Sequence, residues 1–293
     1  MTPLALALDG RLVPPDGPVF PPLERGLLYG DGLFESFAVF HGHPVDGARH
    51  FERLAASCDV LGFPRPDREA WDRAIALCLG AVGSTARAVR ATWTRGFSTA
   101  RGYAPDADAG PPRLLVAAYA APDDEAPRRR QGVSAAPVRD LAPGDLARHK
   151  TLSAMTYVVA QARARAAGAD EAILVDESGR LLESAGANLF VRTGAGVLTP
   201  PAARPILPGL TRALVLGWLG DAGREADLKP EDLAGAHEAF LTNSVRGIVP
   251  LLHFDGGPIG PGEPGEVTRE LLERWGSWCA GVVEENRPGQ RSS

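Results

Sequence analysis

Short apolar runs separated by a turn signal near the start of the chain are typical of a small antiparallel sheet. Residues 4–8 and 11–13 are short apolar runs on either side of Asp9-Gly10, a pair that tolerates the positive φ angles of a tight turn. These runs predict a β-hairpin. Residues 33–40 are rich in Phe, Leu and Val and predict a longer strand.

Two amphipathic helices are predicted after that strand. Asp46 and Asp67 stand where a helical periodicity begins, so each predicts a helix N-cap, and Gly62 predicts the end of the first helix. The second helix has one apolar face with spacings of three and four residues. That face comprises Trp71, Ile75, Leu79 and Val82.

A change in composition predicts the boundary between two domains. Residues 88–94 and 114–120 predict buried strands around a loop, 95–112, which is rich in Gly, Pro and Asp and long enough to be functional. From 121 to 132 the chain turns to Pro, Asp, Glu and Arg. We therefore predict an N-terminal α/β domain over 1–120 and an interdomain linker over 121–132.

The remaining sequence predicts a larger domain over 133–286 and a disordered tail over 287–293. A strand at 133–138 precedes an Ala/Arg-rich helix at 152–168. Further helices are predicted after Pro208 and before the tail. Turn signals separate short strands at 171–175, 180–183, 188–192 and 196–198 and a strand that ends at 244.

Length and charge limit the class of protein. The chain has 293 residues, of which 44% are apolar, so it is long enough to bury the cores of two globular domains. Its formal net charge is -5, and the single basic run, Arg128-Arg129-Arg130, is flanked by polar and acidic residues. This charge pattern argues against nucleic acid as a partner.

The cysteines and the apolar runs indicate the compartment. Cys58, Cys78 and Cys279 are odd in number and widely spaced, which predicts neither a disulfide framework nor a zinc site. No apolar run approaches the ~20 residues of a membrane span, and residues 1–10 lack the basic region of a signal peptide. We expect a cytoplasmic protein that does not insert into membranes.

Lysine is almost missing from this chain. Among 31 Lys and Arg residues, only Lys150 and Lys229 are lysines. An ammonium can lose its proton and attack a carbonyl, whereas a guanidinium cannot. Lys229 precedes a proline at a predicted helix start and is interpreted as a solvated residue, so Lys150 is the candidate for chemistry.

Other catalytic motifs are incomplete. The pattern Gly-x-Ser-x-Gly does not occur, which argues against a serine nucleophile. His41 and His43 have no neighbouring cluster of Cys, His or carboxylates, so no metal site is predicted. Gly30-Asp31-Gly32 lacks the third glycine of a dinucleotide-binding loop.

Six blocks of sequence occur in a fixed order between residues 25 and 250. They are RGLLYGDGLFE at 25–35, HFERL at 50–54, HKT around Lys150, ESAGANLF at 183–190, LPGLTR at 207–212 and LTNS at 241–244. As a set they resemble the fold-type IV pyridoxal-phosphate enzymes, the family of branched-chain and D-amino-acid aminotransferases and aminodeoxychorismate lyase. The resemblance implies a two-domain α/β (α+β) fold, with a smaller N-terminal α/β sandwich and a larger C-terminal, mixed β-barrel-like domain with helices.

The resemblance also implies the cofactor, pyridoxal 5′-phosphate, and the residues that bind it. Lys150 would form a Schiff base with the cofactor and then act as the base that moves protons. Glu183 would face the pyridine nitrogen, and Arg53 the phosphate. The other cofactor-binding residues that it implies are Asn188, Leu207, Leu210, Thr211, Ser244 and Val245.

Two loop sequences favour a lyase. Residues 95–105 contain the Arg-Gly-Tyr sequence found in aminodeoxychorismate lyases, and NSVRG at 243–247 is similar to them as well. Arg101 and Arg246 in these loops suit a dicarboxylate amine as the small-molecule substrate. The resemblance implies a substrate-binding set of Arg101, Arg246, Phe34 and Asn243.

We therefore expect a lyase that converts 4-amino-4-deoxychorismate to 4-aminobenzoate and pyruvate through an external aldimine, with Lys150 as the base and elimination of enolpyruvate. Two features depart from the family pattern: Phe97-Ser98-Thr99 replaces the glycines of the usual lyase loop, and Met155 stands where aminotransferases commonly carry Tyr.

Two alternatives stay open. One is a class IV aminotransferase that acts on D-amino acids, branched-chain amino acids or amines with a keto-acid acceptor. The other is a pyridoxal-phosphate-binding protein without catalysis. The resemblance also implies a homodimer.

Overall fold

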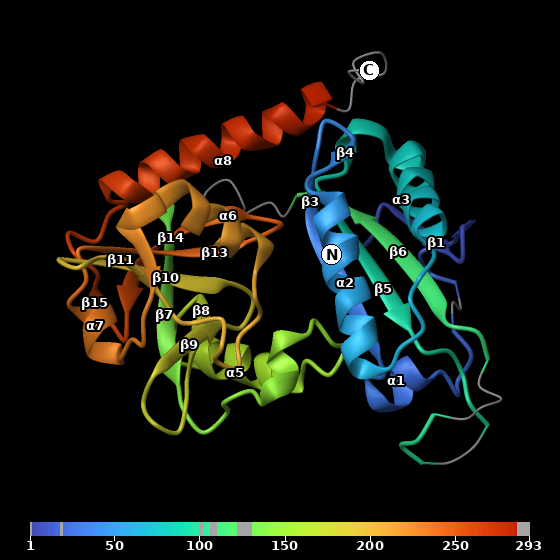
Figure 1. Cartoon of the computed structure of the whole chain (residues 1–293), viewed down its shortest axis with the longest axis horizontal. Helices are drawn as coiled ribbons and strands as arrows, with labels where there is room; N and C mark the ends of the chain where they lie inside the picture. Colours follow the sequence, from blue (N-terminus) through green and yellow to red (C-terminus); the bar gives the residue numbers. More distant parts are fainter. Residues whose placement is uncertain (1, 18–19, 100–101, 106–109, 122–130, 286–293) are drawn as a thin grey trace. The chain divides into compact units, whose positions relative to one another are not determined.

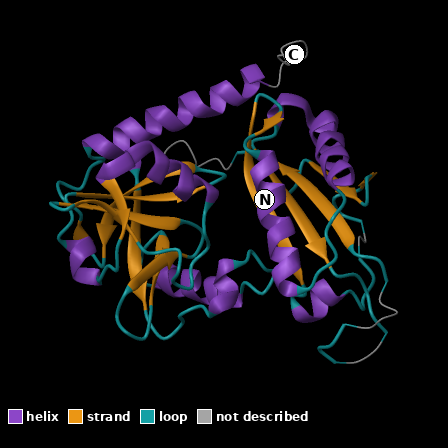
Figure 2. Ribbon diagram, viewed as in Figure 1, coloured by secondary structure: helices purple, strands orange, loops and turns teal. Residues whose placement is uncertain are grey.

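The computed structural model describes residues 2–17, 20–99, 102–105, 110–121 and 131–285. The chain divides into two compact units, each of which combines a sheet with helices (Figures 1 and 2). This architecture confirms the predicted two-domain α/β fold class.

Membership of the two units does not follow a single cut in the sequence. The first unit comprises the described residues of Met1–Pro122, His149–Ala154 and Cys279–Ser293, and the second comprises those of Asp123–Arg148 and Met155–Trp278. Most of the predicted linker lies outside the described residues.

The first unit is built on a six-stranded sheet with the order β2-β1-β6-β5-β3-β4, in which every neighbouring pair is antiparallel. Its strands are β1 (Ala5–Leu8), β2 (Arg11–Val13), β3 (Gly32–Phe40), β4 (His43–Pro44), β5 (Ala88–Thr94) and β6 (Arg113–Tyr119). The predicted hairpin is confirmed, because Asp9 and Gly10 have φ angles of 48° and 76° between β1 and β2.

Helices cover one face of this sheet. They are α2 (Gly47–Leu61) and α3 (Arg68–Val82), which is followed by a 3-10 turn at Gly83–Thr85, whereas the short α1 (Arg25–Tyr29) precedes β3. Phe37 of β3 packs into the same core as Leu54 of α2 and Trp71 of α3. Because side chains alternate along a strand, Phe34 of β3 points to the opposite face.

The segment around Lys150 belongs to the first unit. The backbone N–H of Phe34 donates to the carbonyl of Lys150 (2.9 Å), and the N–H of Leu152 donates to the carbonyl of Gly32 (2.9 Å). These bonds pair the segment with the start of β3. They also explain why helix α5 (Met155–Ala166) begins at Met155 rather than at the predicted residue 152.

The second unit is built on a nine-stranded mixed sheet with the order β12-β11-β10-β13-β14-β7-β8-β9, and β15 pairs with β14. Its strands are β7 (Val133–Val138), β8 (Glu171–Val175), β9 (Leu181–Ser184), β10 (Asn188–Thr193), β11 (Gly196–Thr199), β12 (Gly223–Glu225), β13 (Glu238–Asn243), β14 (Gly247–Phe254) and β15 (Gly257–Pro258). Strands β9 and β10 contact each other although they are far apart in this order, so the sheet curls into a half-barrel.

Helices of the second unit pack outside the curled sheet. Besides α5 they are α6 (Leu210–Leu219), α7 (Pro230–Ala234) and the part of α8 (Glu266–Glu285) up to Trp278, with 3-10 turns at Asp145–Arg148 and Gly220–Ala222. Ala160 and Ala164 of α5 pack against Leu174 of β8, whereas Leu189 and Leu241 belong to a separate core cluster of the same sheet. No helix among the described residues combines the length and apolar character needed to cross a membrane.

The two predicted N-caps have different outcomes. The carboxylate of Asp67 accepts a hydrogen bond from the N–H of Ala70 (2.8 Å), as predicted for the start of α3. Asp46 precedes the first residue of α2 and Gly62 follows its last residue, as predicted, but the side chain of Asp46 caps no N–H group of the helix. Its backbone is left-handed (φ 57°), whereas a capping residue is normally extended, and its carboxylate instead pairs with Arg49 at 3.2 Å.

Candidate functional site

Lys150 lies beside the ring of Phe34 in the first unit. Its Nζ is 4.4 Å from the centroid of that ring, and its backbone carbonyl accepts the hydrogen bond from the N–H of Phe34. Lys150 itself is partly buried. A backbone pairing of this kind holds the lysine at the edge of the sheet by bonds that do not depend on its side chain. Phe34, which was predicted to bind the substrate, therefore lies beside the lysine that is the candidate for chemistry.

Arg90 is a candidate that the sequence analysis missed. Its guanidinium carbon lies 3.5 Å from the centroid of the same Phe34 ring. Burial lowers the pKa of Arg90, and no acidic side chain of the described chain is paired with it. The signal that could have identified it is the register of the sheet, in which Arg90 of β5 lies opposite Ser36, two residues along β3 from Phe34.

Arg53, the predicted phosphate ligand, is held by a buried carboxylate. Its Nε donates to Oε1 of Glu35 (2.8 Å) and its Nη2 donates to Oε2 (2.6 Å). Nδ1 of His50 lies 2.6 Å from Oε2 of the same carboxylate. Burial by itself would raise the pKa of Glu35, but Arg53 and His50 outweigh it and lower the pKa to about 2. Glu35 therefore fixes the orientation of the Arg53 fork.

This network predicts a specific acid sensitivity. The pKa of Glu35 falls from 4.5 to about 2 on folding. Its carboxylate therefore contributes stability that is fully present above pH 4.5 and is lost as the pH falls through about 2, in total about 3 kcal/mol. We expect the free energy of unfolding of the wild type to approach that of Glu35→Gln as the pH falls through this window. Urea denaturation of both proteins across the window measures it, and a constant difference would contradict it.

Glu183 is the centre of a hydrogen-bonded cluster in the second unit. It is 4% exposed at the end of β9. The hydroxyl of Tyr157 donates to its Oε1 (3.0 Å), while Nδ2 of Asn188 and the backbone N–H of Leu207 donate to its Oε2 (both 3.1 Å). Donors of this kind stabilise the ionised form of a carboxylate. The predicted residues Asn188 and Leu207 thus converge on Glu183.

Tyr157 is the member of this cluster that sequence reasoning missed. It lies on α5, and burial together with the charge of Glu183 raises the pKa of its hydroxyl, so it stays a hydrogen-bond donor. The apolar periodicity of the helix gives no sign of this contact, because the partner strand is separated from it in sequence.

The N-terminus of α6 lies beside the turn that follows β13. Thr211, in the first turn of α6, has its hydroxyl 3.2 Å from that of Ser244. Gly209 precedes the helix, and a Cβ at that position would lie 2.0 Å from Oδ1 of Asn188. The first N–H groups of a helix, here those of Leu210 and Thr211, lack acceptors within the helix and favour an anion. The second unit therefore presents hydroxyl and N–H donors together, as an anion such as a phosphate requires.

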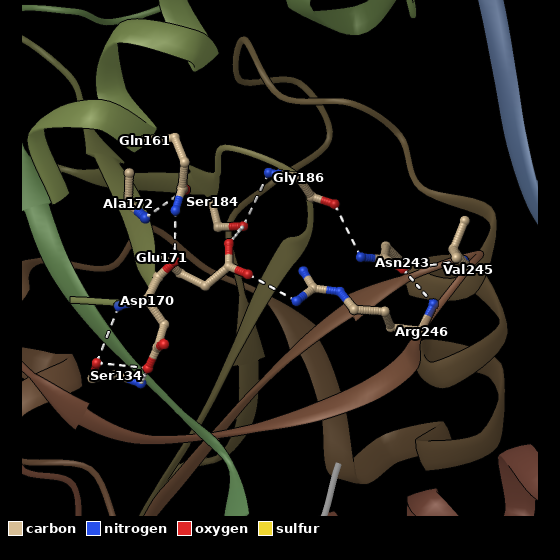
Figure 3. Close-up of polar contacts among 10 residues, drawn as sticks. All are labelled: Ser134, Gln161, Asp170, Glu171, Ala172, Ser184, Gly186, Asn243, Val245 and Arg246. Carbon is tan, nitrogen blue, oxygen red and sulfur yellow. Dashed lines mark hydrogen bonds and ion pairs between the residues drawn. The ribbon is translucent and has the colours of Figure 1, made fainter. Parts of the chain in front are cut away.

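The turn between β13 and β14 carries three more predicted residues, and its side chains have internal partners (Figure 3). Oδ1 of Asn243 accepts from the N–H groups of Val245 (3.0 Å) and Arg246 (2.7 Å). Nη1 of Arg246 lies 2.9 Å from Oε1 of Glu171. Arg246 and Asn243 were predicted to bind substrate. In the structure these polar groups shape the turn.

Arg101, the other predicted substrate ligand, lies outside the described residues. Among the residues that are described, no group of three or more His, Cys, Asp and Glu side chains is arranged to hold a metal ion.

Comparison with known proteins identifies a matching family and similar proteins. The sequence model of the family described as Amino-transferase class IV matches residues 32–254. A putative branched-chain-amino-acid aminotransferase of Methanocaldococcus jannaschii is 30% identical over 280 residues, which cover 93% of this chain and 95% of that protein. A bifunctional aminodeoxychorismate lyase / D-amino acid transaminase of Mycobacterium tuberculosis is 28% identical over 291 residues and covers 92% and 98%.

One solved structure is similar to this chain over most of its length. The crystal structure of 4-amino-4-deoxychorismate lyase from Pseudomonas aeruginosa superimposes with a TM-score of 0.78 at 30% identity, covering 93% of this chain and 98% of that one.

Proposed function

This chain belongs to the class IV aminotransferase family, and from that premise we propose that it is an enzyme which binds pyridoxal 5′-phosphate and acts on a small-molecule amine. The observation that carries the proposal is the carboxylate of Glu183, which is buried and receives hydrogen bonds from Tyr157, Asn188 and Leu207. An ionised carboxylate is the group needed to keep a pyridine nitrogen protonated.

The residues present suit this cofactor. Lys150 carries a primary amine, and the guanidinium of Arg53 is held in one orientation by Glu35. Glu183 carries a buried carboxylate, and Thr211 and Ser244 carry neighbouring hydroxyl groups. These groups are complementary to an aldehyde, a phosphate and a pyridine nitrogen.

The cofactor and the protein would supply different groups for the reaction. When bound, pyridoxal 5′-phosphate supplies a ring that accepts electrons from the substrate carbon that loses a proton. Lys150 would take that proton on Nζ, because an amine, unlike a guanidinium, can serve as a base and a nucleophile. Glu183 keeps its negative charge through its hydrogen bonds, and Arg53 is held in one orientation by Glu35.

For the reaction we propose an aminodeoxychorismate lyase, which forms 4-aminobenzoate and pyruvate from 4-amino-4-deoxychorismate. Support comes from the Arg-Gly-Tyr sequence at 101–103, from the 30% identity to the lyase of Pseudomonas aeruginosa, and from Arg90. A partly buried guanidinium on the face of Phe34 and near Lys150 suits a substrate with two carboxylates.

An aminotransferase is the second candidate, and a specific comparison favours it. The relative from Mycobacterium tuberculosis is named as both a lyase and a D-amino acid transaminase, and the relative from Methanocaldococcus jannaschii is named as a putative aminotransferase.

One experiment separates the two reactions. Purified protein loaded with pyridoxal 5′-phosphate is mixed with 4-amino-4-deoxychorismate, and release of pyruvate and 4-aminobenzoate is measured. In parallel it is mixed with D-alanine, L-leucine and L-glutamate, and conversion of the cofactor to its pyridoxamine form is followed by absorbance. We expect release from aminodeoxychorismate. Conversion by amino acids without such release would overturn the lyase assignment.

The role of Arg90 leads to a further prediction. Arg90→Met is expected to raise KM for the carboxylate substrate by about tenfold or more while kcat changes little, because it removes a charged donor to a substrate carboxylate. Steady-state kinetics with the substrate found above measures this. Arg87→Met is the matched control, since Arg87 is exposed and donates to the backbone carbonyls of Ser84 and Ala86. An equal effect of both substitutions, or none for Arg90→Met, would refute the role.

We also propose that the enzyme is a homodimer. Leu27 of α1 is 71% exposed and Tyr103 is 88% exposed, and the ring of Tyr103 contacts that of Tyr29 with a centroid distance of 5.7 Å. Exposed apolar groups of this kind are typical of surfaces that bind a partner. A second copy is the partner that the family resemblance implies, and sedimentation equilibrium would show twice the mass of the chain.

A further inference from the structure

An ion pair between a buried carboxylate and a partly buried guanidinium connects strand β8 with the turn between β13 and β14 (Figure 3). Nη1 of Arg246 lies 2.9 Å from Oε1 of Glu171, and their side chains are 19% and 8% exposed. Glu171 is the first residue of β8, where it lies in register with Ala135 of the parallel strand β7. The guanidinium of Arg246 is therefore anchored to a rigid part of the sheet.

The turn is shaped by a second anchor. Oδ1 of Asn243 accepts from the N–H groups of Val245 and Arg246, which is the pattern of an Asx turn, and Nδ2 of Asn243 donates to the carbonyl of Gly186 (3.2 Å). Gly247 follows the turn with a φ of 70°, and a Cβ there would lie 2.3 Å from Nε1 of Trp275. The turn is thus bonded to Gly186 on one side and packed against Trp275 on the other.

Ser244 is the residue that this scaffold presents. Its hydroxyl lies 3.2 Å from that of Thr211 at the start of α6. Ser244 is also two residues before Arg246 in the same turn. The turn that holds Arg246 by its backbone N–H therefore also carries Ser244.

We propose that Arg246 is a positioning residue that acts through Glu171 to hold Ser244 beside Thr211, where the two hydroxyls receive the phosphate of the cofactor. This inference rests on the proposed function. It replaces the predicted role of Arg246 as a ligand of the substrate carboxylate. Nη1 of Arg246 is already paired with Oε1 of Glu171, so this guanidinium is held against strand β8.

The proposal is tested with a pair of cofactor forms that differ only in the phosphate. The dissociation constants of pyridoxal 5′-phosphate and of pyridoxal are measured by equilibrium dialysis for the wild type, Arg246→Met and Glu171→Gln. Both substitutions are expected to weaken binding of pyridoxal 5′-phosphate by roughly tenfold, as for loss of a partner that orients a ligand group. Binding of pyridoxal is expected to change less than about twofold, because the turn would act on the phosphate alone.

Two further variants make the test selective. The double variant Glu171→Gln/Arg246→Met leaves no unpaired charge, and because both residues act through one contact its effect on cofactor binding is expected to equal that of either single variant. Arg73→Met is the matched control, since Arg73 pairs with Glu69 on the exposed surface of α3 in the other unit and should leave both constants unchanged.

The alternative outcomes are distinct. If Arg246 binds the substrate, Arg246→Met raises KM with unchanged affinity for pyridoxal 5′-phosphate, and the proposal is overturned. An equal loss of affinity for both cofactor forms, or additive effects in the double variant, overturns it as well. If the wild type binds neither form, the proposed function itself fails, and the inference fails with it.

Discussion

Lys150→Ala is expected to lower kcat by at least about a thousandfold, because it removes both the nucleophile and the base of the proposed reaction. Treatment of the wild type with borohydride in the presence of pyridoxal 5′-phosphate should attach the cofactor irreversibly to the peptide that contains Lys150. The variant should show no such attachment. Folding should be retained, since the segment is held by backbone bonds between Lys150, Phe34, Leu152 and Gly32 that do not involve the side chain.

The chain contains its own control for this experiment. Lys229 is the other lysine, and it is exposed before α7 with its backbone N–H bonded to Asp232 (2.8 Å). Lys229→Arg keeps the charge and should retain full activity and full labelling. Label on the peptide of Lys229, or activity in Lys150→Ala close to that of the wild type, would exclude Lys150 as the reactive amine.

Glu183→Gln is expected to lower kcat by about a hundredfold or more, because a neutral amide cannot balance the positive charge of a protonated pyridine nitrogen. In the wild type, N–H groups of Asn188 and Leu207 donate to the carboxylate of Glu183. The NH2 group of the Gln side chain is itself a donor, so it cannot accept these hydrogen bonds. Turnover with saturating cofactor and the absorbance spectrum of the bound cofactor are the measurements.

Tyr157→Phe tests one hydrogen bond to Glu183 without removing the negative charge of its carboxylate. That substitution removes the donor to Oε1 but leaves the carboxylate, so we expect a change in kcat of less than about tenfold, in line with the loss of one hydrogen bond. A different outcome for Glu183→Gln would contradict the proposed role of Glu183. If kcat stays within threefold of the wild type and the absorbance spectrum is the same, Glu183 does not interact with the cofactor ring.

Much of this architecture could be predicted from local patterns. The hairpin at Asp9-Gly10 and strand β8 depend on neighbouring residues, and periodicity reports these directly. The start of α5 could not be predicted in this way. Its expected first turn is occupied by the pairing of Leu152 with Gly32, a contact between segments far apart in sequence.

The same contrast between local sequence patterns and contacts of distant segments applies to the residues of the candidate site. Lys150 could be identified by its scarcity and by the order of the family blocks, and Glu183 and Arg53 by their position in those blocks. Their partners could not. Tyr157 and Arg90 lack any local motif, because a hydrogen bond or a stacking contact leaves no periodic signal in the sequence.

The sequence by itself determined the family, the fold class and the lysine that is the candidate for chemistry, since these depend on residue type and order along the chain. Only the tertiary structure decided what each charged side chain faces. Glu35 meets Arg53, and Glu171 meets Arg246, because strand register and helix packing bring distant residues within hydrogen-bond distance. Arg246 was predicted from its motif as a substrate ligand, and in the fold its charge is opposed by a buried carboxylate that no local pattern reveals.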